Sequence, residues 1–194
     1  MRKAQYQRST NETNINISIN LDGEGVSNIN TGIGFFDHML NLFASHSRFD
    51  LDVNCDGDIE VDGHHSVEDI GIALGTVFKN ALGDKRGINR YGTFYLPMDE
   101  SLALVSVDIS GRPYLVYYND EMAPMIGNYD TELTEEFLRA FAFNAAITLH
   151  VNVLYGRNSH HKVEAIFKSL GHALRIATEY DPRMNDIPST KGVL

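Results

Sequence analysis

The chain has 194 residues, a formal net charge of −10 and a hydrophobic share of 43%, which is ordinary for a globular protein. The acidic balance argues against nucleic acid as the main partner, because binding to a phosphate backbone needs a basic face. No apolar run approaches the ~20 residues of a membrane span, and the polar residues after Met1 do not form a secretory signal, so no membrane partner is expected. The single cysteine, Cys55, excludes an intrachain disulfide and fits a reducing cytoplasm, which is the expected location.

The first half of the chain alternates strand and helix patterns. Apolar residues alternate with polar ones over residues 15–21, which predicts a half-buried strand. Helical spacing follows at residues 35–43, and two short strands are predicted at 51–53 and 59–61 around an Asp-Gly turn. An apolar helix face then runs over residues 67–81 and ends near a glycine.

The second half repeats this order. Residues 102–109 and 114–118 are predicted strands, residues 132–146 a helix, residues 149–153 another strand and residues 163–177 the closing helix. Each half therefore runs strands, helix, strand, helix. No low-complexity linker separates the halves, so the sequence predicts a duplicated α+β protein whose halves share one packed unit.

A histidine-rich motif occurs once in each half. The pattern His-His-x-x-Glu stands at residues 64–68 and again at residues 160–164, 96 residues apart. Imidazole and carboxylate are ligands that manganese, iron and zinc accept readily. An isolated histidine pair is commonly a solvated surface feature, but repetition of all three positions favours two metal-ligand sets.

The duplication nominates two further ligands. His38 lies 26 residues before His64, and Glu136 lies 24 residues before His160. Both side chains can bind the same divalent metal. The alternatives are a partly buried cap histidine for His38 and a solvated helix glutamate for Glu136.

Several segments that follow one another along the chain resemble the imidazoleglycerol-phosphate dehydratases, enzymes of histidine biosynthesis. They include GFFDHML at residues 34–40, GHHSVED at 63–69, PMDE at 97–100, SGRPY at 110–114, TEL at 131–133, NSHHKVEA at 158–165 and PSTKGV at 188–193. The resemblance implies a duplicated α+β fold of the ribosomal-protein-S5-domain-2-like type, in which each half has a mixed sheet packed by helices. Residues 1–92 would form the first structural repeat and residues 93–194 the second.

The resemblance also implies a homo-oligomeric cage of twenty-four subunits built from trimers, with two manganese ions per subunit at the subunit contacts. One ion would take His38, His65, Glu68 and His161. The other would take His64, His160, Glu164 and the residue at position 136. A histidine is common at that last position in the family, whereas this chain has Glu136, which keeps a ligand but adds negative charge.

The reaction implied is a hydro-lyase reaction on a small-molecule phosphate substrate. Water is lost from D-erythro-imidazole glycerol phosphate to give imidazole acetol phosphate, through a metal-bound imidazolate and a diazafulvene intermediate. The residues implied as catalytic are Glu12, the candidate acid/base, with His46 and Asp99. Ordinary surface or turn positions are the alternatives for Glu12, Asp69 and Asp99; otherwise Asp69 and Asp99 would orient ligand histidines.

The implied substrate site combines metal ligands, acid/base groups and phosphate-binding cations. Its members are Glu12, His38, His46, His64, His65, Glu68, Arg90, Arg112, His160, Lys168, Ser189, Thr190 and Lys191. Arginine supplies a two-pronged donor for phosphate and lysine a point charge. Without the resemblance, Arg112 and Lys168 would be interpreted as solvated surface cations.

Two other functions remain open at this stage. A dinuclear hydrolase on the same scaffold would use metal-bound water and would not need residues 189–191. A non-catalytic metal-storage cage places its ligands on long bundle helices, which the strand-rich pattern of this chain disfavours.

Overall fold

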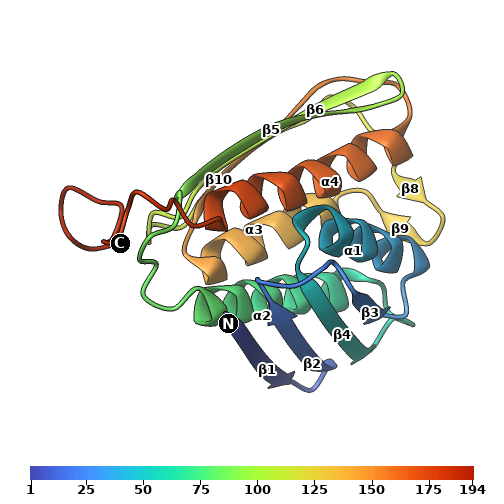
Figure 1. Cartoon of the computed structure of the whole chain (residues 1–194). Helices are drawn as coiled ribbons and strands as arrows, with labels where there is room; N and C mark the ends of the chain where they lie inside the picture. The colour runs from blue at the N-terminus through green and yellow to red at the C-terminus, as the bar shows by residue number, and fades with distance from the viewer.

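Four helices lie between two four-stranded sheets, in a computed structural model that describes all 194 residues (Figure 1). The first half consists of β1 (Lys3–Ser9), β2 (Thr13–Asn20), β3 (Ser27–Asn30), α1 (Gly34–Ser47), β4 (Asp50–Gly57) and α2 (His64–Leu82). The second half consists of β5 (Tyr91–Met98), β6 (Ser101–Asp108), β7 (Tyr114–Tyr118), a small hairpin of β8 (Met125–Ile126) and β9 (Tyr129–Asp130), α3 (Leu133–Ala145), β10 (Thr148–Tyr155) and α4 (Ser159–Thr178).

The two sheets have the same topology, which confirms the duplicated α+β fold. Their strand orders are β1-β2-β4-β3 and β5-β6-β10-β7. In each sheet the last strand pairs in parallel with its neighbour and the other pairs are antiparallel, so both sheets are mixed. The second sheet begins at Tyr91, so a boundary after residue 92 falls inside β5.

Each half packs its helices against those of the other half. Helix α2 lies along α3 and α1 lies along α4, and one continuous cluster of 47 buried hydrophobic residues joins both halves. Glycines allow the helices to approach closely. A Cβ at Gly75 of α2 would lie 2.5 Å from the carbonyl oxygen of Phe141, and one at Gly171 of α4 would lie 2.8 Å from that of Phe43. The halves therefore form one unit.

Most predicted elements are confirmed, but the strand predicted at residues 59–61 is wrong. Strand β4 instead runs unbroken through Asp56 and Gly57, and a turn follows that leads into α2. Ile59 and Val61 are 46% and 66% exposed, so they lack the burial that would stabilise a short strand. Strands β1 and β3 were not predicted because, as edge strands, they carry few buried apolar side chains.

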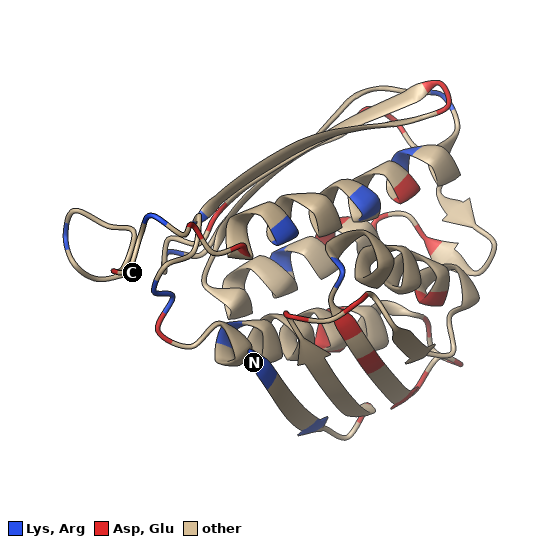
Figure 2. Ribbon diagram, viewed as in Figure 1, with Lys and Arg blue, Asp and Glu red and all other residues tan.

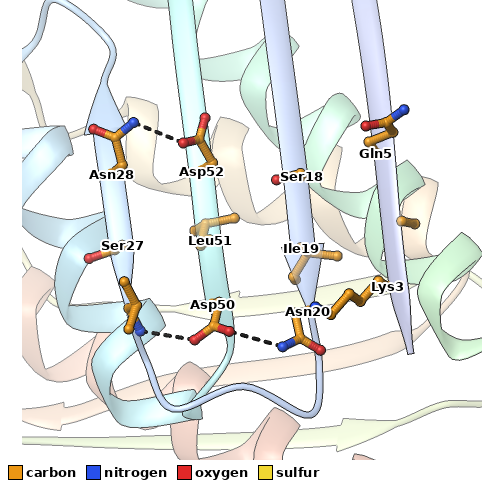
Figure 3. A pocket seen from close by; sticks show the side chains of 12 residues that line it. Lys3, Gln5, Ser18, Ile19, Asn20, Ser27, Asn28, Asp50, Leu51 and Asp52 are labelled. Atoms are coloured by element: carbon orange, nitrogen blue, oxygen red, sulfur yellow. Dashed lines mark hydrogen bonds between the residues drawn. The ribbon is translucent and has the colours of Figure 1, made fainter. Parts of the chain in front are cut away.

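The outer faces of the two sheets differ in chemistry. A hollow of about 510 Å³ on the first sheet is lined largely by polar side chains, many of which bond to each other across strands (Figure 3). Asp50 accepts from the Nδ2 of Asn20 at 2.9 Å, and Asp52 accepts from that of Asn28 at 2.8 Å. The second sheet instead exposes tyrosines, namely Tyr91, Tyr95, Tyr114 and Tyr118.

The helix contacts across the halves give a stability prediction. Gly75→Ala should lower the free energy of unfolding by about 1–3 kcal/mol, because the new methyl group must push α2 away from α3. The measurement is urea denaturation followed by circular dichroism. Gly34→Ala, at a position with no neighbouring atom within 4 Å, is the matched control. Equal stability of the two variants would contradict this account of the packing.

Candidate functional site

Both histidine pairs stand at the first turn of a helix, and the two helices begin at the same end of the molecule (Figure 1). Polar side chains fix these starts. The carboxylate of Asp62 accepts from the backbone N–H of His64 at 2.7 Å, and the side chain of Asn158 accepts from that of His160 at 2.9 Å. Residues four apart share one helix face, so the first histidine and the glutamate of each motif point the same way.

Three predicted ligands converge between α1 and α4. The Nε2 atoms of His38 and His160 lie 3.5 Å and 3.1 Å from Oε2 of Glu164. The three ligand atoms all lie within 4.8 Å of one another, which is a separation that one divalent ion can bridge. Two imidazoles and a carboxylate therefore form a preassembled partial metal site.

Glu164 is held ready to act as a ligand. Its side chain is buried, and burial alone would raise the pKa of its carboxyl group. The ammonium of Lys168, 2.5 Å from Oε1, and the ring of His160 outweigh that effect and hold the pKa below its ordinary value. Glu164 is therefore ionised at neutral pH, with one oxygen on Lys168 and the other facing the two histidines.

The first half presents a matching but looser arrangement between α2 and α3. Nε2 of His64 lies 3.9 Å from the carboxylate of Glu68. His64 and Glu136 line the same hollow of about 530 Å³, between the start of α2 and the start of α3. Glu136 is bound by the guanidinium of Arg139 at 2.8 and 2.9 Å, which offsets its charge. Glu136 of α3 thus lies at the motif of α2, as His38 of α1 lies at the motif of α4.

The second histidine of each pair is turned toward carboxylates of its own half. Nδ1 of His65 lies 3.0 Å from Asp58, and Nδ1 of His161 lies 2.7 Å from Glu100. These bonds raise the pKa of each histidine, and bonds from the backbone of Asn158 and from His161 lower the pKa of Glu100. Because each Nδ1 faces a carboxylate, Nε2 is left as the metal-binding nitrogen of each ring.

The hairpin turns of the two halves carry equivalent carboxylates. Glu12, between β1 and β2, lies 3.7 Å from Nε2 of His65. Asp99, between β5 and β6, lies 3.8 Å from Nε2 of His161. Each half therefore repeats the same order of hairpin carboxylate, histidine and supporting carboxylate.

The grouping within one chain differs from the expected ligand sets. His38 lies with His160 and Glu164, whereas the resemblance placed His38 with His65, Glu68 and His161. The rings of adjacent histidines stand almost at right angles, with interplanar angles of 86° and 82°. Each second histidine bonds through Nδ1 to Asp58 or Glu100, and His161 is not part of the group that His38, His160 and Glu164 form.

The interpretation of Asp69 as a residue that orients a ligand histidine is wrong. Its carboxylate accepts from Oγ1 of Thr13 at 2.6 Å and pairs with Arg8 at 2.8 Å. Asp69 therefore ties α2 to the β1–β2 hairpin that carries Glu12. Sequence analysis missed Asp58, Glu100 and His172. Glu100 had a signal because it lies in the PMDE segment, and His172 had one because it lies four residues after Lys168 on the helix face of the motif.

The predicted phosphate-binding cations form two separate groups. Lys168 lies beside Glu164. Arg90 pairs with Asp108 at 2.7 Å and donates to the carbonyl of Pro188 at 2.9 Å, and Arg112 pairs with the same aspartate at 3.7 Å. The backbone N–H of Arg90 bonds to Ala177, nine residues after Lys168 along α4, which is about 14 Å of helix. The segment with Ser189, Thr190 and Lys191 lies at that far end (Figure 1).

A family model described as imidazoleglycerol-phosphate dehydratase matches residues 31–174, which is most of the chain. The chain belongs to this dehydratase family. The dehydratase of Acetivibrio thermocellus is 58% identical and that of Caldanaerobacter subterraneus subsp. tengcongensis 59% identical, with 100% of this chain and 99% and 100% of those proteins covered.

Solved structures of dehydratases agree with this assignment. The crystal structure of the Staphylococcus aureus protein superposes with a TM-score of 0.83 at 47% identity and covers 92% of this chain and 99% of that one. The Pyrococcus furiosus protein gives a TM-score of 0.83 at 37% identity and covers 97% and 100%. The imidazoleglycerol-phosphate dehydratases are hydro-lyases of histidine biosynthesis, so this is the function of the chain. None of its helices is both long enough and apolar enough to cross a membrane.

Proposed function

We propose that this dehydratase uses two Mn²⁺ ions per subunit and acts through acid/base residues beside them. The convergence of His38, His160 and Glu164 carries the proposal, because a preassembled, ionised nitrogen and oxygen donor set suits Mn²⁺. The looser arrangement of His64, Glu68 and Glu136 would hold the second ion. Bound ions supply Lewis-acid stabilisation of negative charge on the substrate's imidazole ring.

We further propose that each site is completed by a second copy of the chain. His65 and His161 are expected ligands, yet within one chain they bond to Asp58 and Glu100 and do not join the group of His38, His160 and Glu164. The cations of the phosphate site are also divided between the two ends of α4. A homo-oligomer in which one subunit presents His65 or His161 to its neighbour's ligand set would supply the missing donors. The twenty-four-subunit cage of trimers is the assembly proposed here.

The proton transfers fall to the hairpin carboxylates in this proposal. Dehydration removes a hydroxyl group from the carbon attached to the ring and a proton from the next carbon. Glu12 is about half exposed and lies 3.7 Å from His65, so its oxygens are free to face a substrate held at the metal ligands. Glu12 would take the carbon-bound proton, and Asp99 is its equivalent in the other half.

The substrate phosphate would be bound by cations from both ends of α4. Lys168 would contribute from the subunit that supplies Glu164, and Arg90, Arg112 and Lys191 from a neighbour. Arg112 is the more available of the two arginines, because its side chain is 67% exposed whereas that of Arg90 is 12% exposed.

Metal removal is the first test. Chelation should abolish turnover of imidazoleglycerol phosphate and reduce the size of the assembly together, since ligands from two chains link metal binding to association. Metal analysis and light scattering would measure both, with about two Mn²⁺ per subunit expected for full activity. Active, full-sized particles without metal would contradict the proposal.

Glu12→Gln separates the base from the ligands. The change is nearly isosteric and removes no proposed ligand, so turnover should fall roughly 10²–10⁴-fold while manganese content stays at the wild-type level. Glu164→Gln is the comparison, because it should lose metal first and activity as a consequence. A fully active Glu12→Gln protein would show that the base lies elsewhere.

Mixed oligomers test the division of the phosphate site between chains. Lys168→Ala and Arg112→Ala should each bind substrate poorly, because each loses a charged partner of the phosphate. Random mixing of equal amounts of the two variants should give both cations to roughly a quarter of all sites, if the two cations come from different subunits. Each variant dissociated and reassembled alone is the control. Mixtures that remain inactive would place both cations in one chain.

A further inference from the structure

Helix α4 carries four polar side chains along one face, each four residues from the next: His160, Glu164, Lys168 and His172. Each step is about 6 Å along the helix, and Figure 2 shows both basic and acidic residues along α4. Helix α1 packs alongside, with His38 near one end and His46 near the other. The seam between the two helices thus starts at the metal ligands, passes Lys168 and ends at a second pair of histidines.

Those two histidines bond to each other. Nδ1 of His46 lies 3.0 Å from Nε2 of His172, and Nε2 of His46 makes no hydrogen bond within the chain. Gly171 allows this approach, since a Cβ there would lie 3.2 Å from the Cβ of His46. The ring of His172 is stacked on Phe94, with centroids 4.1 Å apart and an interplanar angle of 15°. His172 is therefore fixed in orientation.

The equivalent seam of the first half has none of these groups. Helix α2 continues its motif face from His64 and Glu68 to Ile72 and Thr76, at the places of Lys168 and His172. Asn144 of α3 lies eight residues after Glu136, as His46 lies eight residues after His38. Its side chain donates to the carbonyl of Ala140 in its own helix. The duplicated halves therefore differ at this point, and only the α1–α4 seam combines an ammonium with an imidazole pair.

The surroundings of His172 select its tautomer. Its Nδ1 is buried and has no hydrogen-bond partner. A neutral imidazole carries one N–H and one bare nitrogen, and a buried N–H without an acceptor is rarer than a buried acceptor without a donor. The proton of His172 therefore belongs on Nε2, where it is donated to Nδ1 of His46. As a result, His46 must carry its own proton on Nε2.

Both rings are neutral under ordinary conditions, as this account requires. Burial is the largest cause that lowers the pKa of His172 to about 4, and the nearby His46, Arg175 and Arg48 contribute to this lowering. Burial, Lys168 and Arg48 also lower the pKa of His46. Protonation of both rings would place two donors against each other, and two neutral rings keep one donor and one acceptor in the bond.

We propose that His172 is a positioning residue that holds His46 as its Nε2–H tautomer, so that His46 donates a hydrogen bond to a phosphate oxygen of the substrate beside Lys168. This inference rests on the proposed placement of the substrate phosphate at Lys168. Without His172, His46 would exchange between two tautomers and its ring would be free to turn. Part of its population would then present a bare nitrogen to an anion, which repels it.

The tautomer is measured without reference to activity. Solid-state ¹⁵N NMR of the assembled protein, labelled in histidine, should show His46 with a protonated Nε2 and a bare Nδ1. His172→Phe keeps an aromatic ring on Phe94 but removes the donor, and should give a mixture of tautomers for His46. His46→Ala identifies the signal. A protonated Nδ1 in the wild-type protein, or an unchanged signal in His172→Phe, would overturn the proposal.

The effect on phosphate is measured with inorganic phosphate as a competitive inhibitor and with the substrate itself. In His172→Phe the inhibition constant and KM should both rise about 10-fold, as for a lost hydrogen bond to a charged group, while kcat and manganese content stay within about threefold of wild type. His172→Gln, which can donate from its amide, should restore most of the affinity. The exposed His150→Phe is the matched control.

The outcomes separate a positioning role from a structural one. If the role of His172 is structural, His172→Gln should be less stable than His172→Phe, because the amide cannot stack on Phe94 as an aromatic ring does. Inhibition by phosphate should then be unchanged in both variants. That result would overturn the proposal. A wild-type protein with the expected tautomer and phosphate affinity whose turnover does not depend on manganese would contradict the proposed function, and would leave the assignment of His172 supported.

Discussion

The close approach of helices from opposite halves is the constraint on which the site depends. Gly75 and Gly171 allow α2 to meet α3 and α1 to meet α4 at distances that a side chain would prevent. That packing brings His38 of the first half to His160 and Glu164 of the second. Because the contact is reciprocal, Glu136 of the second half lies at the hollow that contains His64 of the first. Duplication by itself gives one His–Glu pair in each half. Packing of each pair's helix against a helix of the other half adds a third candidate ligand.

The electrostatics of the two halves are matched to different tasks. On α4 the carboxylate of Glu164 is buried, so it needs Lys168 to remain ionised without an ion present. On α3 the carboxylate of Glu136 is partly exposed and is offset by Arg139. The lysine serves two purposes, because a single ammonium can satisfy one oxygen of Glu164 and still present donors to an anion. A protein with a net charge of −10 would bind a phosphorylated substrate in this way, because the proposed cations are local and ion pairs with neighbouring carboxylates hold them in place.

Much of this arrangement could be predicted from the sequence. Apolar periodicity predicted all four helices and the buried strands β2, β6 and β10, because their burial patterns are regular. It did not predict the edge strands β1, β3 and β5, which have few or no fully buried apolar side chains, and it was wrong at residues 59–61, where three apolar-rich residues have no partner strand. The resemblance placed His160 with Glu164 in one ligand set, and the two lie together because residues four apart share one helix face. The crossing of His38 to the other half depends on helix packing, which the spacing within one half does not contain.

Residues that support the site were harder to predict than the ligands, for a physical reason. Asp58 and Glu100 contact the second histidines from loops, and no periodic pattern links a loop residue to its partner. His172 lies on a helix face with the ligands, but its partner is on another helix. Ligands must be side chains of a few chemical types at fixed spacing, whereas any carboxylate or imidazole that the fold brings within reach can support them. The supporting residues are therefore a consequence of tertiary structure.

Under the proposed placement of the phosphate, the contrast between the two seams would give the duplicated halves one substrate orientation. Two identical halves would give two equivalent ways to place an imidazole between the ligand sets, with the phosphate at either end. Lys168, His46 and His172 occur in one seam, while Ile72, Thr76 and Asn144 stand at the corresponding positions of the other. An anion is attracted to the first seam and gains nothing from the second, where a phosphate would lose water without a charged partner. If the proposed site is correct, the difference in free energy between the two orientations, more than the strength of either ligand set, would fix which carbon of the substrate faces Glu12.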